Sequence, residues 1–324
     1  MRFTVAFVAL GLAGLGIAWA GIGCGGDDTT TTPPAAADCA PVAACTTVKS
    51  DCEALADNSP ASVEKATLRF SQLTVTGPPA LATGLIATTI ADDVLLHQPD
   101  CNLTGAGTFS WLMEFDKATG DLRTGGARPS KPETGYCFVN EMLGTTMVSP
   151  LVAKGALKDG KFSAAMGTDV VYIPIYLDDT GKTYVLLPLR KPTVEGTLSS
   201  DFNCVGSYNA KGLKPVDNCE GTTDIPTFIN GGKLAGHITL EEADGVDVAI
   251  LKQSLCVLLS AGKAAMYGDG GMPIERCKRD PGTMKILLEG DWCSTTNTAG
   301  GCKDSFELSA EFAASGMKVT GDCP

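Results

Sequence analysis

The segment TFSWLMEFD (residues 108–116) alternates between large apolar side chains and a second set of side chains. The apolar set consists of Phe109, Trp111, Met113 and Phe115. Successive side chains of a β-strand point to opposite faces, so this period of two predicts a strand with one buried face. The segment SFELSAEF (residues 305–312) shows the same period. Together, the two segments favour a mainly β protein.

Two further segments, DVVYIPIYL (169–177) and TYVLLPL (183–189), are apolar on both faces. Such a pattern is typical of strands near the middle of a packed sandwich. Each segment contains a proline, Pro174 or Pro188. Because proline has no N–H to donate, we expect these residues at a sheet edge or at a bulge.

Turn signals separate the strand patterns at short intervals. They are DKATGD (116–121), KDGK (158–161), DDTGK (178–182), NGG (230–232) and SG (315–316). Closely spaced hairpins favour antiparallel pairing. We therefore predict an antiparallel β-sandwich or barrel-like domain over residues 61–324, with one or two short helices and many disulfides.

Two segments have helical rather than strand spacing. In PVAACTTVKSDCEAL (41–55), apolar and cysteine residues recur every three or four positions, which predicts a cysteine-bearing helix within residues 38–57. In VAILKQSLCVLLSAG (248–262), the leucines fall on one side, and Gly262 is a suitable end.

The first residues have the layout of a secretory signal. Residues 3–23 carry no charge and follow Arg2, so we expect residues 1–23 to be a signal peptide. A membrane-spanning helix is the alternative, because the run is long enough to span a bilayer. The Thr/Pro/Ala-rich segment 24–37 has the composition of a flexible tether.

The sequence GIGC (21–24) resembles the lipobox of bacterial lipoproteins at Ile22, Gly23 and Cys24. It departs from that motif at Gly21, where the family usually has leucine. The resemblance implies that Cys24 becomes the first residue and carries a diacylglycerol and a further acyl chain such as palmitate. The protein would then be anchored to a membrane by this lipid alone, outside the cytoplasm, at the outer membrane of the cell envelope.

Cysteine usage points to the same compartment. Setting Cys24 aside, the thirteen cysteines leave an even number, which disulfides can absorb completely in an oxidising compartment. These disulfide candidates are Cys39, Cys45, Cys52, Cys101, Cys137, Cys204, Cys219, Cys256, Cys277, Cys293, Cys302 and Cys323. Metal binding is disfavoured, because the chain has no C-x-x-C motif and only two histidines.

Spacing does not determine connectivity, but it suggests one pairing. Short loops would be closed by Cys204–Cys219, Cys256–Cys277 and Cys293–Cys302, and Cys101–Cys137 would bracket the strand that holds Trp111. Cys323 would then join the amino-terminal cysteines and clamp the two ends of the chain together.

The composition excludes some partners. A net charge of −12 repels phosphate backbones, so we expect no nucleic acid binding. Aromatic residues make up only 6% of the chain, which weakens a carbohydrate-binding role. We expect no cofactor. Structural calcium at the acidic turns around Asp178–Asp179 and Asp269 is the alternative, although the EF-hand spacing is absent.

Glu114 and Asp116 are the candidate catalytic residues, because alternate strand positions share a face and paired carboxylates can cleave glycosidic bonds. Their spacing resembles the Glu-x-Asp of sandwich-fold glycoside hydrolases. Those families continue to a further glutamate on the same strand, whereas a turn follows here at residues 117–120. A solvated outer face is the favoured interpretation. His237 is interpreted as a surface residue, since no G-x-S-x-G motif is present to use it.

No catalytic constellation emerges from the sequence. We therefore expect a lipid-anchored cell-envelope protein with a binding, adhesion or structural role, whose partner is a surface ligand or another envelope protein. The alternative is a secreted polysaccharide hydrolase that uses Glu114 and Asp116.

Overall fold

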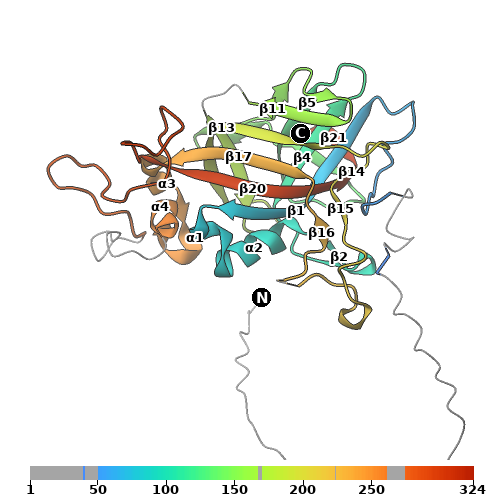
Figure 1. The fold of residues 1–324 in the computed structure, drawn as a ribbon, viewed down its shortest axis with the longest axis horizontal. Coiled ribbons are helices and arrows are strands. Elements are labelled where there is room, and N and C mark those ends of the chain that lie inside the picture. Colours follow the sequence, from blue (N-terminus) through green and yellow to red (C-terminus); the bar gives the residue numbers. More distant parts are fainter. Residues whose placement is uncertain (1–38, 41–49, 167–169, 223, 261–273) are drawn as a thin grey trace, which may run out of the picture. The chain divides into compact units, whose positions relative to one another are not determined.

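The computed structural model describes residues 39–40, 50–166, 170–222, 224–260 and 274–324 (Figure 1). The chain divides into two compact units, Met1–Ala37 and Asp38–Pro324, and every described residue belongs to the second unit. Within these described ranges, no helix combines the length and the apolar character that a bilayer crossing requires. The predicted signal, lipid site and tether lie outside the described residues.

One large sheet dominates the described residues and confirms the predicted mainly β, antiparallel-rich fold. It has thirteen strands in the order β10-β11-β13-β17-β20-β1-β4-β5-β6-β21, with β12 paired to β13, β14 to β20 and β9 to β5. The pairing of β21 with β6 is parallel. The strands are β1 (Lys65–Gly77), β4 (Ser110–Asp116), β5 (Leu122–Ala127), β6 (Tyr136–Phe138), β9 (Leu151–Ala153), β10 (Leu157–Lys158), β11 (Lys161–Ala165), β12 (Val170–Tyr176), β13 (Tyr184–Thr197), β14 (Cys204–Val205), β17 (Gly232–Thr239), β20 (Ser305–Gly316) and β21 (Val319–Asp322).

Four two-stranded sheets accompany it. They pair β2 (His97–Gln98) with β3 (Leu103–Thr104), β7 (Glu141–Leu143) with β8 (Thr146–Val148), β15 (Ser207–Tyr208) with β16 (Phe228–Ile229), and β18 (Asp247–Val248) with β19 (Gln253–Ser254).

The two alternating segments that predict strands lie on either side of β1. They form β4 and β20, and Leu68 of β1 pairs with Met113 of β4 on one side and with Gly316 of β20 on the other. Leu68 and Met113 are completely buried. The predicted strands are therefore confirmed, but the expectation of one buried face is wrong for β4, because Ser110, Leu112 and Glu114 on its other face are buried as well.

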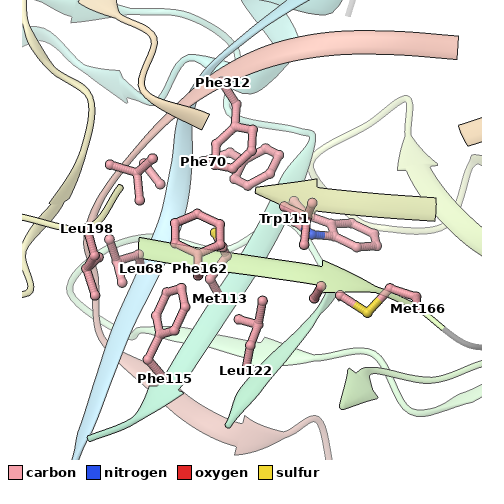
Figure 2. Packing of buried hydrophobic residues seen from close by; sticks show 14 of the residues in the cluster. Leu68, Phe70, Trp111, Met113, Phe115, Leu122, Phe162, Met166, Leu198 and Phe312 are labelled. Carbon is pink, nitrogen blue, oxygen red and sulfur yellow. The ribbon is translucent and has the colours of Figure 1, made fainter. Parts of the chain in front are cut away.

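The sheet curls so that strands far apart in its order face each other. The ring of Phe115 on β4 lies 5.1 Å from the ring of Phe162 on β11. Pro174 of β12 approaches β5 so closely that a Cβ at Gly126 would lie 2.6 Å from the proline Cγ. Figure 2 shows the apolar side chains that fill the curl, including the stacked pair Phe70 and Phe312, whose ring centroids are 4.2 Å apart.

The prolines of the doubly apolar strands lie where the sequence predicts. Pro174 is in β12, which pairs only with β13 among the described strands. Pro188 lies in the part of β13 that precedes Arg190, the first residue paired with β17. At both positions the strand has no hydrogen-bonded neighbour on one side, so the missing proline N–H leaves no sheet hydrogen bond unformed.

Three of the five predicted hairpins are confirmed, at residues 116–121, 158–161 and 178–182. The two others are wrong. Residues 230–232 connect β16 to β17, which pair with different strands. Residues 315–316 end β20, which pairs with β1, and β21 then pairs with β6.

The described helices are α1 (Pro79–Ala82), α2 (Gly84–Val94), α3 (Leu240–Gly245) and α4 (Leu255–Leu259), with 3₁₀ turns at Pro99–Cys101, Pro215–Asp217 and Ala249–Leu251. Helices α1 and α2 lie beside β1 (Figure 1). Neither was predicted. Ile86, Ile90 and Val94 recur four residues apart in α2, and this spacing was the available signal.

The predicted helix at 248–262 is wrong over most of its described length. Lys252 adopts a left-handed conformation with φ of 53° between the short strands β18 and β19, which interrupts the helical path. Among the described residues of this segment only α4 is α-helical, and the side chain of Ser254 caps it by accepting from the N–H of Val257.

The predicted helix within 38–57 is also not formed over residues 50–57, while residues 41–49 lie outside the described part. The N–H groups of Leu55 and Ala56 both donate to the carbonyl oxygen of Gly316 instead of to their own segment. These hydrogen bonds to the end of β20 take the place of the hydrogen bonds that the same N–H groups would form within a helix.

Five disulfides join described cysteines: Cys39–Cys219, Cys52–Cys204, Cys137–Cys323, Cys256–Cys277 and Cys293–Cys302. Cys101 is also disulfide-bonded. The last two pairings confirm the prediction.

The other predicted pairings are wrong. Cys204 bonds to Cys52 rather than to Cys219, and Cys137 bonds to Cys323 rather than to Cys101. The parallel pairing of β21 with β6 places Cys323 beside Cys137, a contact between distant segments that spacing along the chain does not reveal.

Candidate functional site

The predicted catalytic pair is held by local structural contacts. Glu114 is only 8% exposed, and its Oε1 lies 2.9 Å from the Nζ of Lys65 on the neighbouring strand. Asp116 turns back on the hairpin, where its Oδ1 accepts from the N–H groups of Ala118 and Thr119. These bonds, chiefly the one from Thr119, lower the pKa of Asp116.

Neither carboxylate lines any of the five most prominent cavities among the described residues. Glu114 is not on a solvated outer face, because it is buried against Lys65, whereas Asp116 is held in a hairpin turn. The geometry supplies a structural role for both side chains, and a catalytic role stays a prediction.

His237 is not a surface residue, which corrects the interpretation from its sequence. It is 3% exposed, within β17 between β13 and β20. Burial lowers the pKa of His237, and the nearby cations of Lys191 and Arg190 lower it further. The side chain is therefore a neutral imidazole near pH 7.

The two described groups of potential metal ligands are both built on disulfides. They are Asp244 with Cys256 and Cys277, and Asp304 with Cys293 and Cys302. A cysteine in a disulfide has no thiolate to offer a metal ion.

The acidic turn proposed for calcium is used in another way. One oxygen of Asp178 accepts from the N–H and the hydroxyl of Thr180, and the other accepts from the N–H of Thr183. These bonds close the hairpin between β12 and β13 and lower the pKa of Asp178 strongly. Asp269 lies outside the described residues, so calcium at that position stays a prediction.

The strongest site candidate is an apolar cavity of about 120 Å³ against the curled sheet. Strands β1, β12, β13, β17 and β20 contribute to its wall, and helices α1 and α2 contribute Leu81, Ile90 and Asp93. The lining residues are Phe70, Leu73, Val75, Gly77, Leu81, Ile90, Asp93, Phe109, Trp111, Ile173, Ile175, Leu187, Leu189, Leu234, Leu308, Ser309 and Ala310.

The strand period explains this lining. Leu73, Val75 and Gly77 are alternate residues of β1, as are Ile173 and Ile175 of β12. Alternate side chains project from the same face of a strand, so each strand turns a row of apolar side chains toward the cavity. The sequence predicted these strands, but it did not show that their apolar rows leave a space between them.

Trp111 connects the cavity to the core. Its indole Nε1–H donates to the Oγ1 of Thr124 at 2.7 Å, which satisfies the polar atom of the ring. The rest of the ring is free to line the cavity and also packs in the apolar cluster of Figure 2. A change in the cavity contents is therefore expected to alter the fluorescence of this tryptophan.

Asp93 is the single ionisable residue among the described residues that line the cavity, and the cavity surface itself is almost entirely apolar. It lies in the last turn of α2, and its Oδ1 accepts from the hydroxyl of Thr108 at 3.1 Å. Its backbone carbonyl accepts from the N–H of Phe109 at 2.9 Å. These two contacts fix the end of the helix against the segment that enters β4.

Arg69 secures the same helix end from within the protein. The guanidinium is 1% exposed, and it donates to the carbonyls of Phe70, Val94 and Phe109 and to the hydroxyl of Ser110 at 2.8–3.0 Å. A cation at a helix C-terminus satisfies carbonyls that have no partner within the helix. Arg69 therefore acts as a positioning residue for α2 and for Asp93.

The carboxylate of Asp93 makes no ion pair with any described residue, although it is half-buried. Burial raises the pKa of Asp93, the hydroxyl of Thr108 opposes this shift, and the neighbouring carboxylate of Asp92 adds to it. The half-buried carboxylate of Asp93 thus lacks a counter-ion among the described side chains.

Sequence reasoning did not single out Asp93 or the cavity. Asp92 and Asp93 form an ordinary acidic pair in the sequence, and only the structure shows that Asp92 is exposed while Asp93 is one of the residues that line the cavity. No protein-family model, curated protein or solved structure matches the chain.

Proposed function

We propose that the protein is an exported, lipid-anchored binding protein of the bacterial cell envelope that holds a small apolar molecule in the cavity between the curled sheet and helices α1 and α2. The apolar cavity carries this proposal. Its volume of about 120 Å³ is close to that of a cavity that binds benzene, which is about 150 Å³. The ligand is therefore about the size of one aromatic ring.

The cellular location in this proposal rests on two features. The lipobox resemblance at Ile22, Gly23 and Cys24 supports export and a lipid anchor. The disulfides support an oxidising compartment, where such bonds persist. The anchoring membrane in this proposal is the outer membrane. Intact-mass measurement of the native protein tests the lipid anchor, because the anchor adds the mass of several acyl chains to a polypeptide that begins at Cys24.

Toluene tests the binding function directly. We expect toluene to raise the unfolding temperature in a concentration-dependent manner, because a ligand that binds only the folded state stabilises it. We also expect it to change the fluorescence of Trp111. Absence of both effects at saturating toluene would contradict the proposal.

A matched pair of variants locates the binding. Ala310 lines the cavity, whereas Ala165 is exposed on β11. We expect Ala310→Leu to fill part of the cavity and to weaken toluene binding at least tenfold, and Ala165→Leu to leave it unchanged. Circular dichroism of both variants checks that the fold is retained.

A further inference from the structure

A second apolar cavity, of about 20 Å³, adjoins the larger cavity that is proposed to bind the ligand. We call it the inner cavity. Four residues line both cavities: Trp111, Ile173, Leu189 and Leu234. Because these residues touch both spaces, they form an apolar partition between them.

The two cavities follow one another along strands β12 and β13. Ile175 of β12 lines only the larger cavity, Val171 lines only the inner cavity, and Ile173 between them lines both. At about 3.4 Å per residue, the step from Val171 to Ile175 spans about 14 Å. On β13, Leu187 lines only the larger cavity and Leu189 lines both. The apolar space on this face of the two strands is therefore elongated, and the partition divides it.

The larger cavity lies nearer to solvent. Its residues Ile175 and Leu187 are half-buried, whereas Val171 and Met166 of the inner cavity are each only 6% exposed. A ligand that arrives from solvent therefore meets the larger cavity first. Any part of the ligand that is to occupy the inner cavity must pass the partition.

Trp111 is the largest of the four partition residues. In the view of Figure 2, it lies between Phe70, which lines only the larger cavity, and Met166, which lines only the inner cavity. The indole Nε1–H donates to the Oγ1 of Thr124 at 2.7 Å, and this hydroxyl donates to the carbonyl oxygen of Leu112 at 2.8 Å. The two hydrogen bonds hold the indole in one orientation as part of the partition.

We infer that Trp111 is the specificity-determining residue of the larger cavity, because its indole closes the inner end to the ligand. The ligand is therefore a compact, ring-sized hydrocarbon. An unbranched alkyl chain on such a ring gains little affinity, since its methylene groups are not buried beyond the indole. This inference rests on the proposed binding function and specifies its class of ligand.

Toluene, ethylbenzene and propylbenzene test the inference, because they share one ring and differ successively by one methylene group. Calorimetric titration of the exported protein gives the affinity for each probe, and the readout is the ratio of propylbenzene affinity to toluene affinity. We expect the unmodified protein to bind both with similar affinity. Trp111→Leu joins the two cavities, and we expect it to raise the ratio roughly tenfold, because each buried methylene raises affinity about fourfold.

Two further variants provide the controls. Trp292→Leu removes the other described tryptophan, which lines neither cavity, and is expected to leave the ratio unchanged. Val171→Ile adds a methylene group at the inner cavity, so the double variant Trp111→Leu with Val171→Ile should lose part of the gain.

Circular dichroism checks that each variant is folded. If Trp111→Leu does not fold, Trp111→Phe carries the same test, because phenylalanine keeps an aromatic ring but occupies less of the partition. We expect Trp111→Phe to raise the ratio about fourfold, the factor for one buried methylene.

The outcomes separate this inference from the function on which it rests. If toluene does not bind the unmodified protein, the proposed function is overturned. If toluene binds but the ratio is the same with and without the indole of Trp111, only the inference on Trp111 is overturned. An equal rise in Trp292→Leu, or a rise in Trp111→Leu that Val171→Ile does not reduce, would also overturn it, because the gain would not come from the inner cavity.

Discussion

At the scale of single residues, Glu53 is the least expected feature of the described structure. The residue is 2% exposed, and neither carboxylate oxygen has a hydrogen-bond partner among the described residues. Burial raises the pKa of Glu53 to about 8. It follows Cys52, whose disulfide to Cys204 holds this segment against the sheet, so the chain has little freedom to bring the side chain to water.

The pKa of Glu53 makes stability depend on pH in a defined window. The folded-state value of about 8 lies above the ordinary value of 4.5, so the folded protein binds the proton more tightly than the unfolded chain. The contribution of Glu53 to the free energy of unfolding is fully present below pH 4.5. It declines between pH 4.5 and pH 8 by about 1.4 kcal/mol per pH unit. Above that window, the loss is complete.

We expect Glu53→Gln to remove this pH dependence, because glutamine does not ionise. Urea unfolding at pH 5 and pH 8 measures the effect: the variant should gain stability relative to the unmodified protein as the pH rises. Glu64→Gln, at an exposed position, is the control and should show no such gain. The same stability difference between Glu53→Gln and the unmodified protein at both pH values would contradict the prediction.

At the scale of elements, side-chain hydrogen bonds cap the first turns of helices α3 and α4. Helix α3 starts with a capping box: the Oγ1 of Thr239 accepts from the N–H of Glu242, and the Oε2 of Glu242 accepts from the N–H of Thr239. Arg190 of β13 lies 2.7 Å from the same carboxylate. The cap therefore also joins the helix to the sheet.

This cap predicts a measurable stability difference. Thr239→Ala should reduce the free energy of unfolding by about 1 kcal/mol, because the N–H of Glu242 loses its acceptor. Thr239→Ser keeps the hydroxyl and should restore most of the loss. A Thr239→Ala variant as stable as the Ser variant in urea unfolding would show that the capping box is not needed.

The elements also show which local patterns are reliable. The period of two predicted the strands β4 and β20 correctly because large apolar side chains on one face must be buried, although in β4 the other face is buried too. The helical spacing at 248–262 failed, because apolar residues that recur every three or four positions also fit a hairpin followed by a short helix. Helix α2 was not predicted, although its isoleucines have helical spacing. Asp93 lies in this helix and was therefore not singled out either.

At the scale of the whole molecule, the disulfides join segments that are far apart in sequence. Cys137–Cys323 spans 186 residues, whereas Cys293–Cys302 spans 9. A cross-link stabilises mainly by restricting the unfolded chain, and the effect grows with the length of the closed loop. The long-range bridges should therefore contribute more to stability than the short one.

We expect the double variant Cys137→Ser with Cys323→Ser to lose roughly 5 kcal/mol of unfolding free energy, and Cys293→Ser with Cys302→Ser to lose roughly 2–3 kcal/mol, from the chain-entropy relation. Urea unfolding of the two variants under non-reducing conditions provides the comparison. Equal losses, or a larger loss for the short bridge, would contradict this ranking.

The sequence by itself determined the strand pattern, three hairpins, the edge positions of the prolines and the two disulfides between cysteines close in the chain. These features depend on side-chain period, turn chemistry and short loops, all of which are local. Only the tertiary structure decided the long-range disulfides, the burial of His237 and Glu53, and the apolar cavity with Asp93 in its wall. Each of these depends on which distant strands the curled sheet brings together, and side-chain spacing along one strand does not specify its neighbours.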